Sequence, residues 1–346
     1  MTGGPSIDGV LVKWGERLFY PANRLARTAP PARLSGGLQK RAAAVRARIQ
    51  ATVVRRAPQV MIKVTGGRRG MGAIAAHLRY IAKAGRLPFE DDRGVVEEGK
   101  EALRDLAWQW QYGGSYIGEV SHRREAFNIM LSMPSGTDAM SIQRAAREFA
   151  RAELAGHRWV MVLHDHQANP HVHLSVRAEG RDSRRLNPRK ADLQRWRETF
   201  AEKLRGWGIE AEATRQATRG QLRNYEPLWR VKAAEAGRLR SPREETKSGS
   251  GTERSRKEAI VAWTHIARGL ADSDDAADRA LAESVDRYVR ATPFALEYSR
   301  HLVKHLEQPR LISGREPAPV LEAVRAAKPQ PTLAPAPRRP EIDRQR

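Results

Sequence analysis

Two short segments in the middle of the chain have the pattern of paired β-strands. Residues 158–163 are an arginine followed by an apolar run, and in residues 171–176 the apolar positions Val172, Leu174 and Val176 alternate with polar ones. The Asn169-Pro170 pair between the two segments is typical of a turn. The pattern therefore predicts a β-hairpin.

Four of the ten histidines lie at this hairpin. Because side chains alternate across a strand, His171 and His173 share one face, and His164 and His166 do the same on the other arm. The large apolar side chains then point to the opposite face. A hairpin with imidazoles on one face and apolar residues on the other indicates a metal site.

The patterns on both sides of the hairpin predict further strands and helices. Short apolar runs are typical of strands, and apolar residues at every third or fourth position are typical of helices. The expected order is a strand over 60–65, helices over 71–84 and 100–111, a strand over 126–133, a helix capped by Thr137 or Asp138, the hairpin, and a helix from Asn187-Pro188 to Gly208. This order predicts the α+β class, an antiparallel sheet with helices packed on it.

Composition divides the chain further. The predicted parts are a basic N-terminal arm over 1–58, the sheet domain over 59–230, a linker over 231–255, a helical module over 256–308 and a disordered Pro- and Arg-rich tail over 309–346. In the arm, we expect a short strand at 10–14 and an arginine-rich helix at 39–56. A solvated arm is favoured over an accessory DNA contact, because charge runs are usually solvent faces.

The charge balance narrows the class of partner. The 346 residues include 62 Lys and Arg against 40 Asp and Glu, a net charge of +22, which points to nucleic acid. The absence of cysteine excludes disulfides, cysteine-bound zinc and thiol catalysis, so a metal would need His, Asp or Glu. No apolar run reaches the roughly 18 residues of a membrane span, and no secretory signal pattern begins the sequence. We expect a cytoplasmic protein with no membrane insertion.

The candidate metal ligands are His171, His173 and His164. Three protein ligands with an open position are typical of a catalytic rather than a structural metal site. His166 lies on the same face and competes for the third place, as a ligand or a supporting residue. The alternative is a polar hairpin that binds no metal.

Tyr80 is the candidate nucleophile. In the helix expected over 71–84, it lies nearly opposite the apolar stripe and shares its face with His77 and Lys83. A metal beside a basic surface suggests phosphoryl chemistry, in which water as nucleophile gives a hydrolase and tyrosine gives a covalent phosphoprotein. An ordinary exposed tyrosine is the alternative.

These residues carry a resemblance to a known family. The run from His164 to His173, with Asn169-Pro170 and the His-Val-His pair, is similar to the third motif of MobA-like plasmid mobilisation relaxases, which belong to the HUH endonucleases and include T-DNA border-nicking relatives. Residues 60–85 resemble their first motif, which holds the nucleophilic tyrosine, and residues 131–137 resemble the segment between the two. The resemblance covers about residues 59–222.

The resemblance implies a sheet with helices on one face and a specific reaction. Tyr80 would attack one phosphodiester of single-stranded DNA at a transfer origin, with a divalent metal (Mg²⁺ or Mn²⁺), leaving a 5′-phosphotyrosyl link and a free 3′-hydroxyl. The cations near Tyr80 would contact phosphates without reading sequence: Arg68, Arg69, Arg79 and Lys83. Many relatives have an acidic residue at the position of His166. Implied partners are accessory relaxosome proteins and a type IV secretion coupling protein.

Two alternatives remain open. A rolling-circle replication initiator or single-strand transposase of the HUH type uses related chemistry, but its tyrosine usually follows the histidine pair, whereas Tyr80 precedes it. A non-catalytic basic DNA-binding protein is the other alternative, and the intact histidines argue against it.

Overall fold

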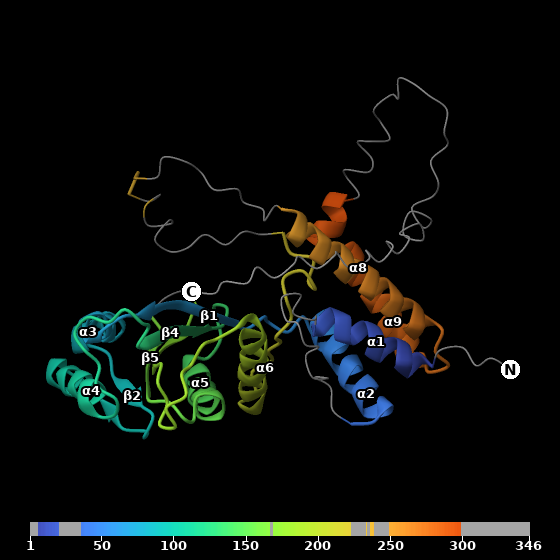
Figure 1. Ribbon diagram of the computed structural model, residues 1–346. Coiled ribbons are helices and arrows are strands. Elements are labelled where there is room, and N and C mark those ends of the chain that lie inside the picture. Colours follow the sequence, from blue (N-terminus) through green and yellow to red (C-terminus); the bar gives the residue numbers. More distant parts are fainter. Residues whose placement is uncertain are drawn as a thin grey trace, which may run out of the picture. The chain divides into compact units, whose positions relative to one another are not determined.

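A computed structural model describes residues 6–20, 36–166, 169–222, 233, 236–238 and 249–298 (Figure 1). Residues 61–177 contain a six-stranded sheet in which every pair of neighbouring strands is antiparallel. In spatial order the strands are β1 (Met61–Arg68), β4 (Ala126–Ser132), β6 (His171–Arg177), β5 (Trp159–His164), β2 (Phe89–Asp91) and β3 (Val96–Glu97). The α+β prediction is confirmed.

The sheet is covered by helices on both faces. On one face, α5 (Ala139–Glu153) and α6 (Lys190–Gly206) pack on apolar side chains of the neighbouring strands β1, β4, β6 and β5. On the other face, α3 (Met71–Ile81) and α4 (Lys100–Tyr112) pack on Val160, Val162 and β2. The expectation of helices on one face only is therefore wrong, because β5 is apolar on both sides and needs cover on each.

The central elements follow the predicted patterns closely. Val172, Leu174 and Val176 all lie in the core beneath α5 and α6, as the alternation predicts. Asp138 rather than Thr137 caps α5, since its carboxylate accepts a hydrogen bond from the backbone N–H of Ser141 at 2.7 Å. The apolar stripe of α3 is buried against α4.

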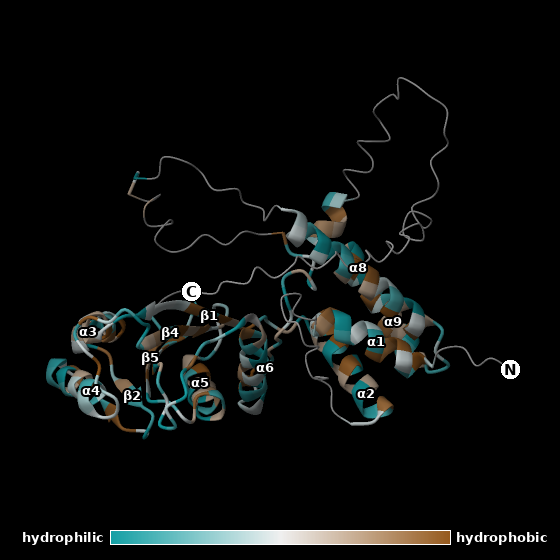
Figure 2. Ribbon diagram, in the orientation of Figure 1, coloured by the Kyte–Doolittle hydropathy of each residue, from teal (hydrophilic) through white to brown (hydrophobic). Residues whose placement is uncertain are grey.

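The helices at the two ends of the described chain share one core. Residues of α1 (Ile7–Phe19), α2 (Leu38–Ile49), α8 (Ser250–Ala271) and α9 (Ala276–Arg290) form a single cluster of buried apolar side chains. Each helix has hydrophobic and hydrophilic residues interleaved along its length (Figure 2). A π-helical turn, Gln50–Val54, continues α2. Division into the predicted domains stays a prediction, but the described helices of the arm are packed, not solvated extensions.

Two local expectations are corrected. The strand expected at 10–14 lies within α1, and its apolar residues face α2 and α8 at helical spacing. The linker expected over 231–255 lies mostly outside the described residues, but its last part is helical, because α8 begins at Ser250 and has an ion pair of 2.8 Å between Glu253 and Lys257. The tail over 309–346 lies outside the described residues. Within the described residues, no helix is both long and apolar enough to span a membrane.

Candidate metal centre

Three histidines converge where β5 and β6 approach the hairpin turn. His164 ends β5, and His171 and His173 begin β6, with His164 directly opposite His171 in the register. One nitrogen of each ring lies within 4.8 Å of the others. The ring centroids are 4.6–5.1 Å apart, and the rings meet edge to face. The alternation of two strands thus brings the three predicted ligands together.

Backbone carbonyls fix which ring nitrogen is free in two of them. His164 donates its Nε2–H to the carbonyl of Ile81 at 2.6 Å, because a carbonyl can only accept. His171 donates its Nδ1–H to the carbonyl of Asn169 at 2.9 Å. Their lone pairs are therefore on His164 Nδ1 and His171 Nε2. Carbonyl partners of this kind orient the histidine ligands of metal sites.

The cluster holds its imidazoles in the neutral form that binds metals. Burial lowers the pKa of His164 and of His171 below the ordinary value of 6.5. Burial and the neighbouring histidines lower the pKa of His173 to about 3. Since a protonated imidazole cannot coordinate, low pKa values keep all three lone pairs available at neutral pH.

The residues fit a divalent metal. His164 Nδ1 is buried and has no hydrogen-bond partner within the described residues, although it carries a lone pair. Burying such an atom unpaired costs free energy that a bound cation would remove. Among the described residues no fourth side chain joins the three neutral nitrogen donors, and such a set leaves positions open for substrate oxygens.

His166 lies outside this cluster. Its ring is next to that of His164, with centroids 5.3 Å apart, but it is not among the converging ligand atoms. Its nearest acidic partner is Asp165, at 3.9 Å and exposed. The geometry thus favours His164 over His166 as third ligand, and the assignment of all of them stays a prediction.

Tyr80 lies in the last turn of α3, beside the cluster. Its side chain is 69% exposed, as expected for a residue opposite the apolar stripe. The next residue, Ile81, is buried and supplies the carbonyl that His164 contacts. The neighbouring Lys83 is close enough to lower the pKa of His164. The hydrogen bond therefore ties the turn that bears Tyr80 to the histidines.

His77 was not predicted as a site residue, but it lies between Tyr80 and the cluster. Its ring stacks beside that of Tyr80, with centroids 6.3 Å apart, and its field contributes to the low pKa of His173. Arg68 donates to His77 Nδ1 at 3.3 Å, so His77 Nε2 carries the hydrogen and, buried, has no partner within the described part of the chain. The clue in the sequence was its position three residues before Tyr80.

The four predicted phosphate-contacting cations divide into two kinds. Arg69 precedes α3 and Arg79 lies in its last turn; both are exposed, whereas Lys83 is half-buried. Arg68 is exposed but also holds His77 in place. Their contact with DNA stays a prediction.

Comparison with known proteins places this site in a class. Residues 94–209 match the family model described as relaxase: MobA/VirD2-like, nuclease domain. This stretch contains the three histidines and begins after Tyr80. The resemblance to MobA/VirD2-type relaxases is thereby confirmed.

One particular relative agrees with the family match. The T-DNA border endonuclease VirD2 of Rhizobium radiobacter is 26% identical over 183 residues, covering 47% of this chain and 43% of that protein. The chain therefore spans less than half the length of this relative.

Proposed function

We propose that the protein nicks and rejoins one strand of DNA at the transfer origin of a plasmid or mobile element. Tyr80 is the proposed nucleophile, and His164, His171 and His173 are the proposed ligands of a divalent metal, Mg²⁺ or Mn²⁺. The observation that supports this best is the convergence of the three histidines beside the turn of α3 that bears Tyr80.

The proposed reaction exchanges one phosphate ester for another. The Tyr80 Oη–P bond forms as the P–O3′ bond breaks, giving a 5′-phosphotyrosyl link, and the net proton transfer is from the tyrosine hydroxyl to the released 3′-oxygen. Because the ester bond is conserved, the reverse attack by a 3′-hydroxyl rejoins the strand. A divalent cation held by the histidines would polarise the phosphate and stabilise charge on its oxygens.

The chain's own residues position the reactants. The exposed Tyr80 hydroxyl is accessible to a strand laid over α3, and His164 holds the end of α3 through Ile81. The His77 Nε2–H next to Tyr80 is buried and has no hydrogen-bond partner among the described residues, so His77 is a candidate for positioning the tyrosine. The net charge of +22 favours a polyanionic substrate.

Adduct formation tests the nucleophile. Incubated with single-stranded origin DNA and Mn²⁺ or Mg²⁺, the protein should form a covalent adduct that survives a denaturing gel. Tyr80→Phe should abolish it while DNA affinity persists. Tyr298→Phe is a control, because Tyr298 is also exposed, at 44%, and its change should leave the adduct unaltered. An adduct that persists in Tyr80→Phe would move the nucleophile elsewhere.

Histidine variants test the metal site. His171→Ala and His173→Ala should each lose cleavage and weaken Mn²⁺ binding measured by calorimetry, since two nitrogens do not suffice for the site. His122→Ala, a change at an exposed histidine outside the cluster, should behave as wild type. A fully active double variant at residues 171 and 173 would overturn the metal assignment.

The alternatives predict different outcomes. A replication initiator or transposase of the HUH type would form the same adduct but on a replication origin or transposon end, so the oligonucleotide that reacts distinguishes it. A non-catalytic DNA-binding protein would give no adduct, and Tyr80→Phe would change neither binding nor plasmid transfer. Accessory relaxosome proteins and a secretion coupling protein remain proposed partners, and a cytoplasmic location remains an expectation.

A further inference from the structure

Three aromatic side chains form an exposed row at one end of the α3–α4 layer. Trp108 and Tyr112 lie one turn apart on α4, and Tyr116 follows in the loop after it. The ring centroids are 5.2 Å apart for Trp108 and Tyr112, and 5.6 Å apart for Tyr112 and Tyr116. The side chains are 63%, 52% and 62% exposed. We call these three residues the aromatic row.

The core does not require these rings. The buried face of α4 consists of Leu103, Leu106 and Trp110, which pack against α3. The aromatic row is on the other side of the helix, where large apolar groups in water are unfavourable. Clustered exposed aromatic groups of this kind mark interaction sites rather than random surface.

Buried polar contacts hold the backbone beneath the row. Arg177, at the end of β6, donates to the carbonyl of Trp110 at 2.8 Å and to the hydroxyl of Ser115 at 3.0 Å. Arg158 donates to the carbonyl of Gln109 at 3.2 Å. The row is thus fixed at both the helix end and the loop, as a preorganised platform requires.

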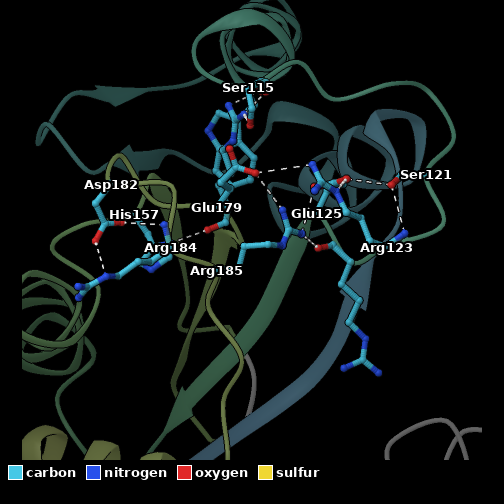
Figure 3. A network of polar contacts seen from close by, with 12 residues as sticks. Ser115, Ser121, Arg123, Glu125, His157, Glu179, Asp182, Arg184 and Arg185 are labelled. Carbon is cyan, nitrogen blue, oxygen red and sulfur yellow. Dashed lines mark hydrogen bonds and ion pairs between the residues drawn. The ribbon is translucent and has the colours of Figure 1, made fainter.

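A second set of contacts anchors the same loop from the other side. Ser115 also hydrogen-bonds to Glu179, which lowers the pKa of that carboxyl. Figure 3 shows Glu179 joined to Arg185 and Arg123, which in turn contact Glu125. The loop therefore belongs to a continuous polar network rather than a free segment.

The charge around the row is mixed. Arg104 lies one turn before Trp108, but it pairs with Glu101, and Asp105 is exposed beside them. Because positive and negative charges are mixed around the aromatic row, the row is suited to binding flat, uncharged groups rather than phosphates. Unpaired nucleobases have such faces, and stacking on Trp or Tyr accepts any base.

We propose that the aromatic row binds unpaired bases of the DNA strand that the nuclease site acts on. The proposal rests on the proposed function. The row is at the Arg177 end of β6, whereas the metal ligands are at the His171 end, a separation of about 20 Å along a strand of this length. The contacted bases would therefore lie several nucleotides away from the scissile phosphate. Their stacking on the aromatic row would hold the strand in place over α3.

Binding to two oligonucleotides tests the proposal. In a Tyr80→Phe background, fluorescence anisotropy compares a labelled single-stranded oligothymidylate with an abasic oligonucleotide of equal length. A Trp108→Leu, Tyr112→Leu double variant should bind oligothymidylate roughly five- to hundredfold more weakly. Its affinity for the abasic strand and the slope of affinity against salt should stay as in the parent, because stacking needs bases and releases no counterions.

Two control variants separate stacking from other effects. Trp108→Phe keeps an aromatic face and should retain most of the affinity, whereas Trp108→Leu should not. Trp207→Leu removes a partly exposed tryptophan at the end of α6 and should have no effect on binding. Unchanged thermal unfolding would verify that the variants fold, as expected at exposed positions.

The outcomes distinguish this proposal from the proposed function. If the double variant binds both oligonucleotides like its parent, the aromatic row does not bind bases, even where the Tyr80-dependent adduct still forms. An equal loss on the abasic strand would also overturn the proposal, because it would indicate a backbone or structural effect. A wild-type protein, with Tyr80 intact, that binds no single-stranded DNA and forms no adduct would overturn both.

Discussion

At the scale of single residues, hydrogen bonds to backbone carbonyls decide what the histidines can do. The Ile81 and Asn169 carbonyls leave one lone pair on each of His164 and His171, and one nitrogen of each ring lies within 4.8 Å of the other ligand atoms of the cluster. The sequence could place these rings on one face, because strand alternation is local. It could not select ring tautomers, since Ile81 is 83 residues away from His164 in the chain.

The same scale holds a prediction about pH. Burial and the charge of Arg68 lower the pKa of His77 from 6.5 to about 4 in the folded protein. Between those values the unfolded chain binds a proton at His77 that the folded chain does not, so the free energy of unfolding falls as pH falls through this window. Above pH 6.5 this loss of stability is absent, because His77 is neutral in both the folded and the unfolded chain.

Urea unfolding of the metal-free protein across this pH range measures the effect. His77→Gln should reduce the slope of unfolding free energy against pH by up to about 1.4 kcal/mol per unit, the value for one proton. His122→Gln is the control, because His122 is exposed and its change should leave the slope as it is. A wild-type slope in His77→Gln would show that His77 is protonated equally in both states.

At the scale of elements, the start of α3 depends on a backbone conformation that only glycine adopts easily. Gly70 has φ +81° and ψ 160°, and a Cβ there would lie 2.2 Å from the carbonyl oxygen of Glu119. Gly70→Ala should therefore destabilise the protein by about 1–3 kcal/mol from backbone strain alone, with the clash in addition. It should also slow adduct formation, because a displaced α3 moves Tyr80.

Gly66→Ala is the matched control for this substitution. Gly66 lies in β1, where an added Cβ meets no atom within 4 Å. Its effect should remain within about 0.5 kcal/mol, as at other surface positions. Equal destabilisation by the two variants, measured by chemical unfolding, would contradict the role assigned to Gly70.

Sequence patterns predicted the elements in which the spacing of apolar residues along the element itself shows which side is buried. The strands and helices that carry the histidines and Tyr80 have a clear apolar stripe or alternation, so both were found. Strands β2 and β3 span three and two residues, too few for any pattern. The second helical layer was missed because Val160 and Val162 lie within a run that is apolar throughout, and such a run does not reveal how many of its faces are covered.

At the scale of the whole molecule, the ends of the described chain depend on each other. Arg46 in α2 binds Asp8 of α1 at 2.8 Å and Asp278 of α9 at 2.8 Å, joining residues more than two hundred positions apart. Sequence patterns treat each helix by itself, so they could not reveal that α1 and α2 complete the core of α8 and α9. Among the described basic residues that suggested a solvated arm, Arg41, Arg46 and Arg48 form ion pairs.

A substitution between α1 and α2 should therefore be detected in α8 and α9. A Cβ at Gly15 would lie 2.6 Å from Val45 Cγ1, so Gly15→Val forces the two helices apart at a cost of about 1–3 kcal/mol. Hydrogen–deuterium exchange should increase across residues 250–290 as well as in α1, while β4 to β6 keep their protection. Gly37→Ala, where an added Cβ meets nothing within 4 Å, should leave exchange unchanged. If Gly15→Val loosened α1 alone, the helices at the two ends would be separate folding units, as the sequence had suggested.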